Sequence, residues 1–260
     1  MASRRTAIVT GSTSGIGLAI AHALAADGCN VVVNSFADTE QDKSIAEEVA
    51  GRHRVEAVYL RADMSKAEEC RALVEQAAAR FGGVDILVNN AGIQHVAPVE
   101  EFPVAKWDAI IAVNLSSAFH TIAAALPLMK KAGSGRIVNI ASAHGLVASP
   151  FKSAYVAAKH GIMGLTKTVA LEVATQGITC NAVCPGYVLT PLVEAQIPDQ
   201  MKAHGMDRET VIREVMLNRQ PSREFATVEQ IGATVSFLCS PAAAQINGTH
   251  ISVDGGWTAE

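Results

Sequence analysis

Tyr155 and Lys159 are four residues apart in an alanine-rich segment that is predicted to be helical, so their side chains should share one face. A tyrosine hydroxyl with its ordinary pKa of about 10 is a poor base at neutral pH. A neighbouring ammonium group favours the phenolate, so we expect Lys159 to lower the pKa of Tyr155. Such a pair suits proton transfer. The spacing alone is common, and a packed tyrosine beside a solvated lysine would show it as well.

Two further polar residues could join this pair. Ser142 follows the apolar segment Gly135–Ala141, where its hydroxyl could bond a substrate oxygen at the edge of a sheet. Asn114 is predicted to lie inside a helix. A buried asparagine in a helix usually satisfies a local backbone group, but it could instead hold a water molecule beside Lys159. Together these four residues predict a site for proton transfer.

Short apolar segments rich in β-branched residues alternate with longer helix-like segments, and they must position this chemistry. The predicted strands are Thr6–Thr10, Asn30–Asn34, Glu56–Arg61, Val84–Asn89, Gly135–Ala141, Ile178–Cys184 and Thr249–Val253. Among the segments between them, Gly17–Ala26, Asp42–Gly51 and Ala67–Arg80 read as helices. This alternation predicts an α/β fold with a doubly wound parallel sheet of about seven strands, in a single domain over residues 1–260.

The segment 190–220 interrupts the alternation. It shows no strand, is rich in Met, Gln and charge, and contains Pro191 and Pro198. It predicts one or two helices inserted after the carboxyl end of a strand, which is the edge where open α/β sheets bind ligands. We expect a small mobile lid over a substrate site, although a packed pair of surface helices would give the same pattern.

The first predicted strand ends in a glycine-rich turn with glycines at Gly11, Gly15 and Gly17, and a helix follows. Glycines allow a tight turn and a close backbone approach, and the helix N-terminus offers free N–H groups to a pyrophosphate. Because the turn lies in the first βα unit of an α/β pattern, it predicts a dinucleotide site. A second turn with small residues, Asn89–Gly92, follows the fourth predicted strand and would let the cofactor approach closely.

The end of the second predicted strand should meet the adenosine ribose. It carries Phe36 and no Arg or Lys that could receive a 2′-phosphate, which favours NAD over NADP. The usual acidic residue is missing at the strand end, and Asp38 comes two or three positions late. Asp63 follows the third predicted strand, where it could bond the adenine or could simply cap the next helix.

The overall composition narrows the classes of function. The net charge is −4, which argues against nucleic acid as the main partner. No apolar stretch reaches about 18 residues, so no transmembrane helix and no membrane partner are expected, and the glycine turn interrupts the apolar N-terminal run that could suggest a signal peptide. The five cysteines form no even framework and no metal-ligand pattern. We therefore expect free thiols, a reducing cytoplasm and no metal site.

Taken together, these segments resemble the short-chain dehydrogenase/reductase family over essentially the whole chain, in order and in spacing. The matching features are the glycine turn, Asn89–Gly92, Asn114, Ser142, Tyr155, Lys159 and Pro185-Gly186. The resemblance implies a Rossmann-like domain that transfers hydride to or from a nicotinamide. It implies that Tyr155 is the base in alcohol oxidation, that Lys159 lowers its pKa and holds the nicotinamide ribose, that Ser142 positions the substrate oxygen, and that Asn114 supports a relay water. The implied cofactor contacts are Gly11, Thr13, Ser14, Gly15, Ile16, Phe36, Asp63, Met64, Asn90, Ala91, Gly92, Val113, Tyr155, Lys159, Pro185, Gly186, Val188 and Thr190.

Polar side chains near the catalytic segments indicate the substrate. Gln94, His144, Lys152 and Gln196 can donate hydrogen bonds and one of them is cationic, which suits a small carboxylate. The wider sequence around these residues resembles family members that interconvert (R)-3-hydroxybutyrate and acetoacetate, and it implies that these four residues hold the carboxylate. The same resemblance implies that Ser142 and Tyr155 bind the substrate oxygen, that Tyr187 forms an aromatic wall, and that Trp257 reaches the pocket from a neighbouring subunit. It also implies a homotetramer, which the low charged fraction of 18% suits.

Two alternatives remain open from the sequence. Another short-chain reductase, such as a 3-oxoacyl-carrier-protein reductase, would prefer NADPH and usually carries basic residues near the glycine turn or near Phe36, where this sequence has none. A non-catalytic nucleotide-binding protein could also use the same fold, because fold does not fix function. The intact set of four polar residues argues against that second alternative.

Overall fold

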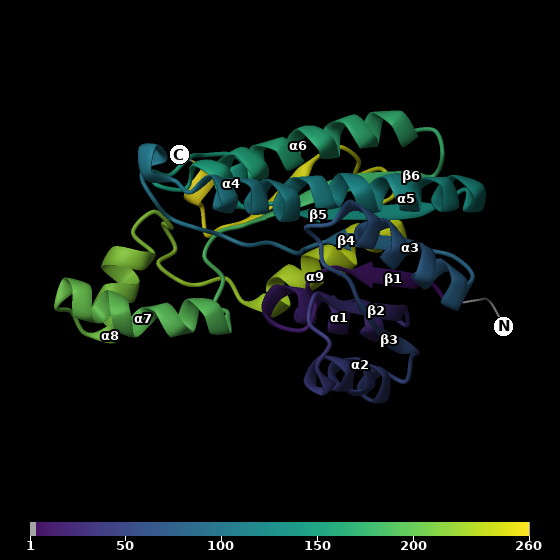
Figure 1. Ribbon diagram of the computed structural model, residues 1–260, viewed down its shortest axis with the longest axis horizontal. Coiled ribbons are helices and arrows are strands. Elements are labelled where there is room, and N and C mark those ends of the chain that lie inside the picture. Colours follow the sequence, from purple (N-terminus) through teal and green to yellow (C-terminus); the bar gives the residue numbers. More distant parts are fainter. Residues whose placement is uncertain (1–3, 260) are drawn as a thin grey trace.

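The computed structural model describes residues 4–259, apart from the side chains of Leu192 and Gln196. Its centre is a sheet of seven parallel strands in the order β3-β2-β1-β4-β5-β6-β7 (Figure 1). The strands are β1 (Thr6–Val9), β2 (Asn30–Ser35), β3 (Ala57–Arg61), β4 (Ile86–Asn89), β5 (Gly135–Ile140), β6 (Ile178–Pro185) and β7 (His250–Val253). The predicted doubly wound parallel sheet is thus confirmed, and the strand ends differ from the prediction by at most about two residues.

Helices cover both faces of the sheet (Figure 1). The α-helices are α1 (Gly15–Ala26), α2 (Glu40–His53), α3 (Ala67–Phe81), α4 (Val104–Ile111), α5 (Ser117–Ala132), α6 (Ser153–Val173), α7 (Pro191–His204), α8 (Arg208–Thr210) and α9 (Val228–Cys239). Short 3₁₀ turns are η1 (Val99–Glu101), η3 (Ala143–Gly145), η5 (Pro241–Ala243) and η6 (Trp257–Ala259), and π-helical turns are η2 (Ala112–Ser116) and η4 (Val211–Met216). One layer contains α1, α2 and α9, and the other contains α3, α5 and α6.

The core forms because successive strand residues point to opposite faces and both faces are covered. In β1, Ile8 packs into the cluster beneath α3, α5 and α6, whereas Ala7 and Val9 pack against α1 and α9. All four residues of β1 and all eight of β6 are buried. The central strands are therefore rigid supports whose carboxyl ends can hold side chains in fixed positions.

The segment 190–220 forms the expected helical insertion. Thr190 accepts a hydrogen bond from the Val193 amide and caps α7, and Pro191 takes the first helical turn, where its missing N–H costs nothing. Helices α7 and α8 stand out from the body of the molecule beyond the sheet (Figure 1). The insertion packs around its own small cluster, which includes the buried side chains of Ile197 and Val211.

The continuous helical stretch Val104–Ala132 differs from the sequence expectation. By length and composition alone it is long and apolar enough to cross a membrane, although no such segment was expected. Its inner side contributes Ile122, Ala125 and Met129 to the core beneath the sheet. A core helix of this layered fold therefore accounts for its hydropathy. In residues 4–259 all five cysteines are free and buried, as predicted.

Candidate active site

A cavity of about 880 Å³ opens at the carboxyl ends of the central strands. Its walls come from the loops after β1, β2, β3, β4, β5 and β6, together with α6 and the start of α7. Parallel strands bring their carboxyl ends to one edge, so motifs far apart in the chain converge here. The residues that line the cavity extend from the glycine turn at one end to Lys152 and Trp257 at the other.

The glycine turn has the backbone that a phosphate cradle needs. Gly11 and Gly15 have φ values of 60° and 53°, in the left-handed region that side chains disfavour. A Cβ on Gly17 would lie 2.5 Å from Nδ2 of Asn90, so the close packing at this point admits only glycine. Ser14 precedes α1 without a side-chain capping bond, which leaves the N–H groups of the first helical turn available to an anion.

The turn after β4 is bonded directly to the glycine turn. Nδ2 of Asn90 donates to the carbonyls of Thr10 and Gly11, both at 2.9 Å. In return Oγ1 of Thr10 accepts hydrogen bonds from the amides of Asn90 and Ala91, both at 3.0 Å. These reciprocal bonds hold the two loops at a fixed separation and so fix the shape of the cradle. The residues present thus fit a dinucleotide.

The end of the cavity beside Phe36 is uncharged except for Asp63. Phe36 is exposed beside it, and the two lysines that line the cavity, Lys152 and Lys159, lie at the other end. Asp38 does not line the cavity and pairs with Lys43 at 3.1 Å. Asp63 does not cap α3, because its carboxylate accepts from the amide and hydroxyl of Ser65 and Lys66 precedes the helix. These two bonds lower the pKa of Asp63 and keep it charged.

Ser142, Tyr155 and Lys159 meet in the middle of the cavity. Ser142 lies two residues after β5 and accepts the amide hydrogen of His144 at 3.1 Å, which fixes its hydroxyl at the sheet edge. Tyr155 and Lys159 lie one turn apart on α6, with Nζ of Lys159 at 5.5 Å from the centre of the Tyr155 ring. The same Nζ donates a 2.8 Å hydrogen bond to the carbonyl of Ile140 at the end of β5. The lysine is thereby held against the sheet and beneath the tyrosine.

The protonation tendencies of this pair differ from the sequence expectation. Burial raises the pKa of Tyr155, and only the hydrogen bond with Ser142 opposes it. Burial also lowers the pKa of Lys159 to about 8, with Cys184 acting in the opposite sense. Burial therefore outweighs the expected effect of Lys159, and the net shift of the Tyr155 pKa is upward. Tyr155 and Lys159 lie on one face of α6, as predicted, but the predicted direction of the Tyr155 pKa shift was wrong.

Asn114 lies in the π-helical turn η2 between α4 and α5. Its Oδ1 accepts from the amide of Ile93 at 2.8 Å, and its Nδ2 donates to the carbonyl of Ile93 at 2.9 Å. Both polar atoms of the buried Asn114 side chain are thus hydrogen-bonded to the loop that follows Gly92. Asn114 is absent from the cavity lining. Of the two interpretations, the structure favours a local backbone partner, and the role of Asn114 toward a water molecule stays a prediction.

The far end of the cavity gathers Gln94, His144, Lys152, Tyr187 and Trp257. Nε2 of His144 lies 2.9 Å from Oγ of Ser149, which orients the imidazole. Burial, and then the charges of Lys152 and Arg219, lower the pKa of His144 to about 4, so the ring is neutral at pH 7. Burial also lowers the pKa of Lys152, with Arg219 adding to the effect. Gln196 falls within α7, but its side chain lies outside the described part of the structure.

Trp257 reaches this end from its own chain, which corrects the expectation of a neighbouring subunit. Gly255 and Gly256 have φ values of 58° and 90°, and this backbone turns the chain back after β7. Asp254 stabilises the turn by accepting from the amides of Gly256 and Thr258, both at 3.1 Å. The Trp257 ring then stacks on Tyr187 with centres 5.6 Å apart and meets His144 edge-on at 5.1 Å. The tail is thus long enough to close the pocket within one chain.

With the exceptions of Asn114 and Gln196, every site residue predicted from the sequence lines this one cavity. Sequence reasoning missed further lining residues that carry no motif: Asn34, Ser35, Ala62, Ile93, His95, Val96, Ile140, Ala141, Pro191 and Val193. Several of these neighbour a predicted residue, so proximity along the chain would have found them. Ser149, which orients His144, had no such signal in the sequence.

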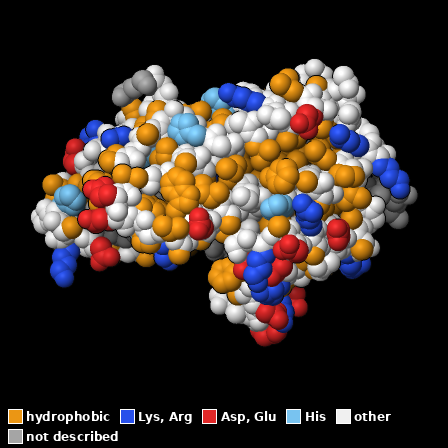
Figure 2. All heavy atoms as spheres, turned by 45° about the horizontal axis from the view of Figure 1, so that its top comes forward, with side chains coloured by type: hydrophobic (Ala, Val, Ile, Leu, Met, Phe, Trp, Pro, Cys, Tyr) orange, Lys and Arg blue, Asp and Glu red, His pale blue; other side chains and the backbone are white. Residues whose placement is uncertain are grey.

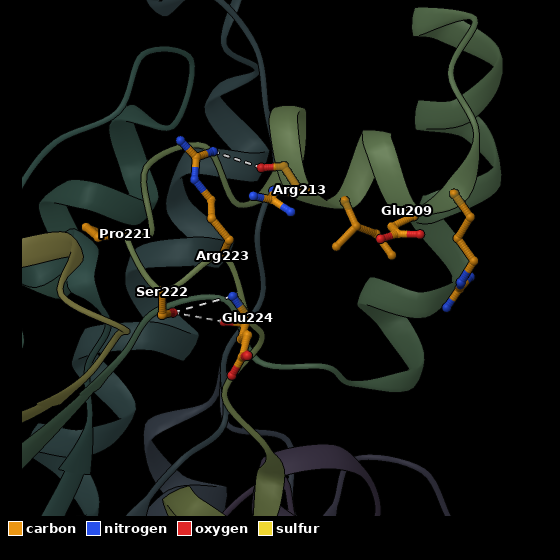
Figure 3. Close-up of a pocket in the computed structure, with 8 residues that line it drawn as sticks. Glu209, Arg213, Pro221, Ser222, Arg223 and Glu224 are labelled. Carbon is orange, nitrogen blue, oxygen red and sulfur yellow. Dashed lines mark hydrogen bonds between the residues drawn. The ribbon is translucent and has the colours of Figure 1, made fainter.

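A second hollow, of about 690 Å³, lies between α8, η4 and the segment 221–224 (Figure 3). Two of the arginines that line it already have partners. Arg208 makes a two-pronged ion pair with Glu194 at 2.7 and 2.9 Å, and Arg223 donates to the carbonyl of Arg213 at 2.8 Å. None of the sequence motifs reaches it. The motifs therefore identify the larger cavity as the functional one.

Known proteins similar to this chain point the same way. A family model for short chain dehydrogenases matches residues 5–201. The chain is 61% identical to the D-beta-hydroxybutyrate dehydrogenase of Rhizobium meliloti (strain 1021), over 98% of this chain and 99% of that protein. It is 55% identical to the D-beta-hydroxybutyrate dehydrogenase of Cupriavidus necator over the full length of both. Among solved structures, a putative short-chain alcohol dehydrogenase from Sinorhizobium meliloti 1021 superimposes with a TM-score of 0.89 at 37% identity, covering 99% of this chain and 98% of that one. The cavity, its motifs and these matches lead to one conclusion: this chain belongs to the short-chain dehydrogenase family.

Proposed function

We propose that this protein is an NAD-dependent dehydrogenase that interconverts (R)-3-hydroxybutyrate and acetoacetate. The observation that carries the proposal is the placement of a cationic side chain, Lys152, in the same cavity wall as Ser142 and Tyr155. A short hydroxy acid has its carboxylate two carbons from its hydroxyl, so both ends can be held at once. The high identity to two D-beta-hydroxybutyrate dehydrogenases supports the same substrate.

The dinucleotide would be held by the glycine turn and by the loop after β4. We assign its phosphates to the first turn of α1 and its adenosine to the region of Phe36, Asp63 and Met64. The absence of Lys and Arg from the described lining around Phe36 supports NAD, because a 2′-phosphate is usually received by such a side chain. When bound, the nicotinamide accepts hydride from C3 of the hydroxy acid.

In oxidation, the residues of this chain have separate tasks. Lys152, with Gln94 and the neutral His144, binds the carboxylate, and we include Gln196 of α7 in this set. Ser142 donates to the substrate oxygen and fixes it beside Tyr155. Tyr155 removes the hydroxyl proton as C3 loses hydride, so acetoacetate, the reduced cofactor and one proton are formed. Lys159 holds the ribose and supplies positive charge beside the phenolate as it forms.

We infer that residues 1–260 work as one domain in which 190–220 closes over the bound substrate. Closure would exclude water from the aromatic end formed by Tyr187 and Trp257. The start of α7 lines the cavity through Pro191 and Val193, so a rigid movement of this helix would change access directly. The same placement supports a contact of Thr190 with the cofactor, since Thr190 lines the cavity near Gly15.

We also propose that the protein is a cytoplasmic homotetramer with neither a membrane nor a nucleic acid as partner. Hydrophobic side chains gather on the face made by α4, α5 and α6 (Figure 2). Val104, Trp107, Phe119 and Leu171 on these helices are exposed. A further copy of the chain would cover this apolar surface. The reaction would place the enzyme in ketone body metabolism.

The direct test is formation of reduced cofactor by the purified protein with each enantiomer of 3-hydroxybutyrate, using NAD and NADP in turn. Turnover of the R enantiomer with NAD, at least about tenfold faster than any other combination, is expected. Turnover preferring NADP and a 3-hydroxyacyl thioester would support the carrier-protein reductase instead. Binding of NADH without turnover of any hydroxy acid would support a non-catalytic role.

A further inference from the structure

Arg219 lies just after η4, at the end of the helical insertion, and no sequence motif includes it. Its Nη1 atom donates to the carbonyl of Ala148 at 3.4 Å, across to the loop that joins Ser142 to Lys152. The adjacent residue Gln220 is buried and accepts a hydrogen bond from the amide of Tyr187 at 3.1 Å. The insertion is therefore attached at this point to two walls of the active-site cavity.

These attachments place the Arg219 guanidinium at the rim of the substrate end. Ala148 precedes Ser149, whose hydroxyl orients His144, and Gln220 fixes the backbone of Tyr187, which stacks on Trp257. Arg219 itself is exposed and does not line the cavity. Its positive charge nevertheless acts on three side chains that do line it, because it adds to the burial that lowers the pKa of His144 and of Lys152, and it opposes the burial that raises the pKa of Tyr187.

The substrate end thus carries two cations and lacks an acidic partner. Among residues 4–259, no carboxylate lies within ion-pair distance of Lys152 or Arg219. The only acidic residue described in the cavity lining is Asp63, at the adenosine end. Two uncompensated positive charges repel each other, and an anion placed between the lysine and the rim relieves that repulsion. The substrate end is therefore suited to bind a small carboxylate.

We propose that Arg219 is a specificity-determining residue that attracts and retains the carboxylate of the substrate from the rim of the cavity. The proposal rests on the proposed oxidation of a short hydroxy acid and deepens it. Arg219 acts through the field rather than through the reacting atoms, so it should affect capture of the anion and leave the chemical step and cofactor binding unchanged.

The test compares Arg219→Gln with a matched control, Arg213→Gln. Arg213 is an exposed arginine of the same insertion, labelled in Figure 3, and it lines the second hollow instead of the active site. Both variants remove one positive charge from the same segment. Arg219→Gln should raise the KM for (R)-3-hydroxybutyrate about five- to tenfold with kcat and the KM for NAD unchanged, whereas Arg213→Gln should match the wild type.

Two further readouts separate charge from local structure. Arg219→Lys keeps the charge and should restore the KM to near the wild-type value, and the difference between Arg219→Gln and wild type should shrink at high salt, because the rim charge is screened. The KM should also begin to rise at a higher pH in Arg219→Gln, because Lys152 keeps its proton longer without Arg219. The ionisable groups that line this end with Lys152 are His95, His144, Tyr155 and Tyr187, and Arg219 lies at its rim. Of these only Arg219 is changed.

A binding measurement distinguishes failure of this inference from failure of the proposed function. If the wild type does not oxidise (R)-3-hydroxybutyrate, the proposed function fails, and acetoacetate is titrated calorimetrically into each variant saturated with NAD. Weaker binding to Arg219→Gln than to Arg213→Gln supports the carboxylate role of Arg219 even then. Equal KM values in the two variants, or equal or absent acetoacetate binding where turnover is absent, would overturn it.

Discussion

The ammonium of Lys159 lies one helical turn below the Tyr155 ring, 5.5 Å from its centre, and is bonded to the end of β5 through the carbonyl of Ile140. Burial pushes both residues toward their neutral forms, raising the pKa of Tyr155 and lowering that of Lys159 to about 8. Burial therefore favours the neutral phenol of Tyr155 and makes Lys159 lose its proton more readily. Bound ligands that offer hydrogen-bond acceptors to Lys159 favour its charged form and, through it, the phenolate.

Replacement of Tyr155 by phenylalanine tests the assigned base. The ring and its packing remain, but the group that exchanges a proton is lost. Turnover of (R)-3-hydroxybutyrate should fall roughly a thousandfold, while the affinity for NADH, measured by fluorescence titration, stays within a factor of about two. A variant that retains most of its kcat would show that another group takes the proton.

Lys159→Met should abolish turnover and yet stabilise the ligand-free protein at pH 7. The folded-state pKa of about 8 lies below the ordinary value of 10.5, so the unfolded chain binds this proton more tightly. The free energy of unfolding of the wild type should therefore rise with pH between these two values. Below pH 8 the buried charge costs about 3 kcal/mol, which the methionine removes. Thermal melts at pH 7 and pH 10 check this, and an equal gain at both values would contradict the buried charge as its cause.

Lys152 and His144 should contribute unequally to carboxylate binding. The pKa of His144 is lowered to about 4, so at pH 7 it offers only a neutral hydrogen bond, whereas Lys152 offers a charge. Lys152→Gln should raise the KM for the hydroxy acid about 30-fold, against a few-fold for His144→Gln, with little change in the KM for NAD. Steady-state kinetics in both substrates provide the measurement. Equal effects of Lys152→Gln on both KM values would remove Lys152 from the carboxylate site.

We expect Asn114 mainly to stabilise the loop after Gly92. Asn114→Leu leaves the amide and the carbonyl of Ile93 without their buried partners and should lower the free energy of unfolding by about 2 kcal/mol. Asn114→Asp can still accept from the Ile93 amide and should be intermediate. Urea denaturation measures both, with the exposed Asn218→Ala as a control that stays near the wild type. An Asn114→Leu variant of unchanged stability and low turnover would instead favour the relay water.

The sequence predicted the sheet well because its strands are buried on both faces and read as apolar segments. The location of the cavity could be predicted equally well, because the loops that follow parallel strands lie at one edge of the sheet and the motifs lie in those loops. The sequence could not predict how strongly burial shifts the pKa values of Tyr155 and Lys159 relative to the effect of nearby charges. That balance depends on how deeply α6 packs against β5, which no spacing reveals.

Several contacts of individual side chains could not be predicted from the sequence either. The expectation for Trp257 failed because two glycines with positive φ turn the tail back onto Tyr187 of the same chain. Asp63 was expected either to cap α3 or to meet the adenine, and the cap falls instead to Lys66. Arg219 carries no motif, and only the folding of the insertion against Ala148 and Tyr187 brings it to the cavity.

The most direct measurement follows the hydrogen on C3. The purified enzyme is given NAD and (R)-3-hydroxybutyrate that carries deuterium at C3, and both products are analysed by mass spectrometry. Direct hydride transfer predicts that the deuterium is recovered on the nicotinamide ring, that acetoacetate carries no deuterium, and that the S enantiomer gives neither product. Deuterium released to water, or turnover that ignores the configuration at C3, would contradict direct hydride transfer from an alcohol held between Ser142, Tyr155 and Lys152.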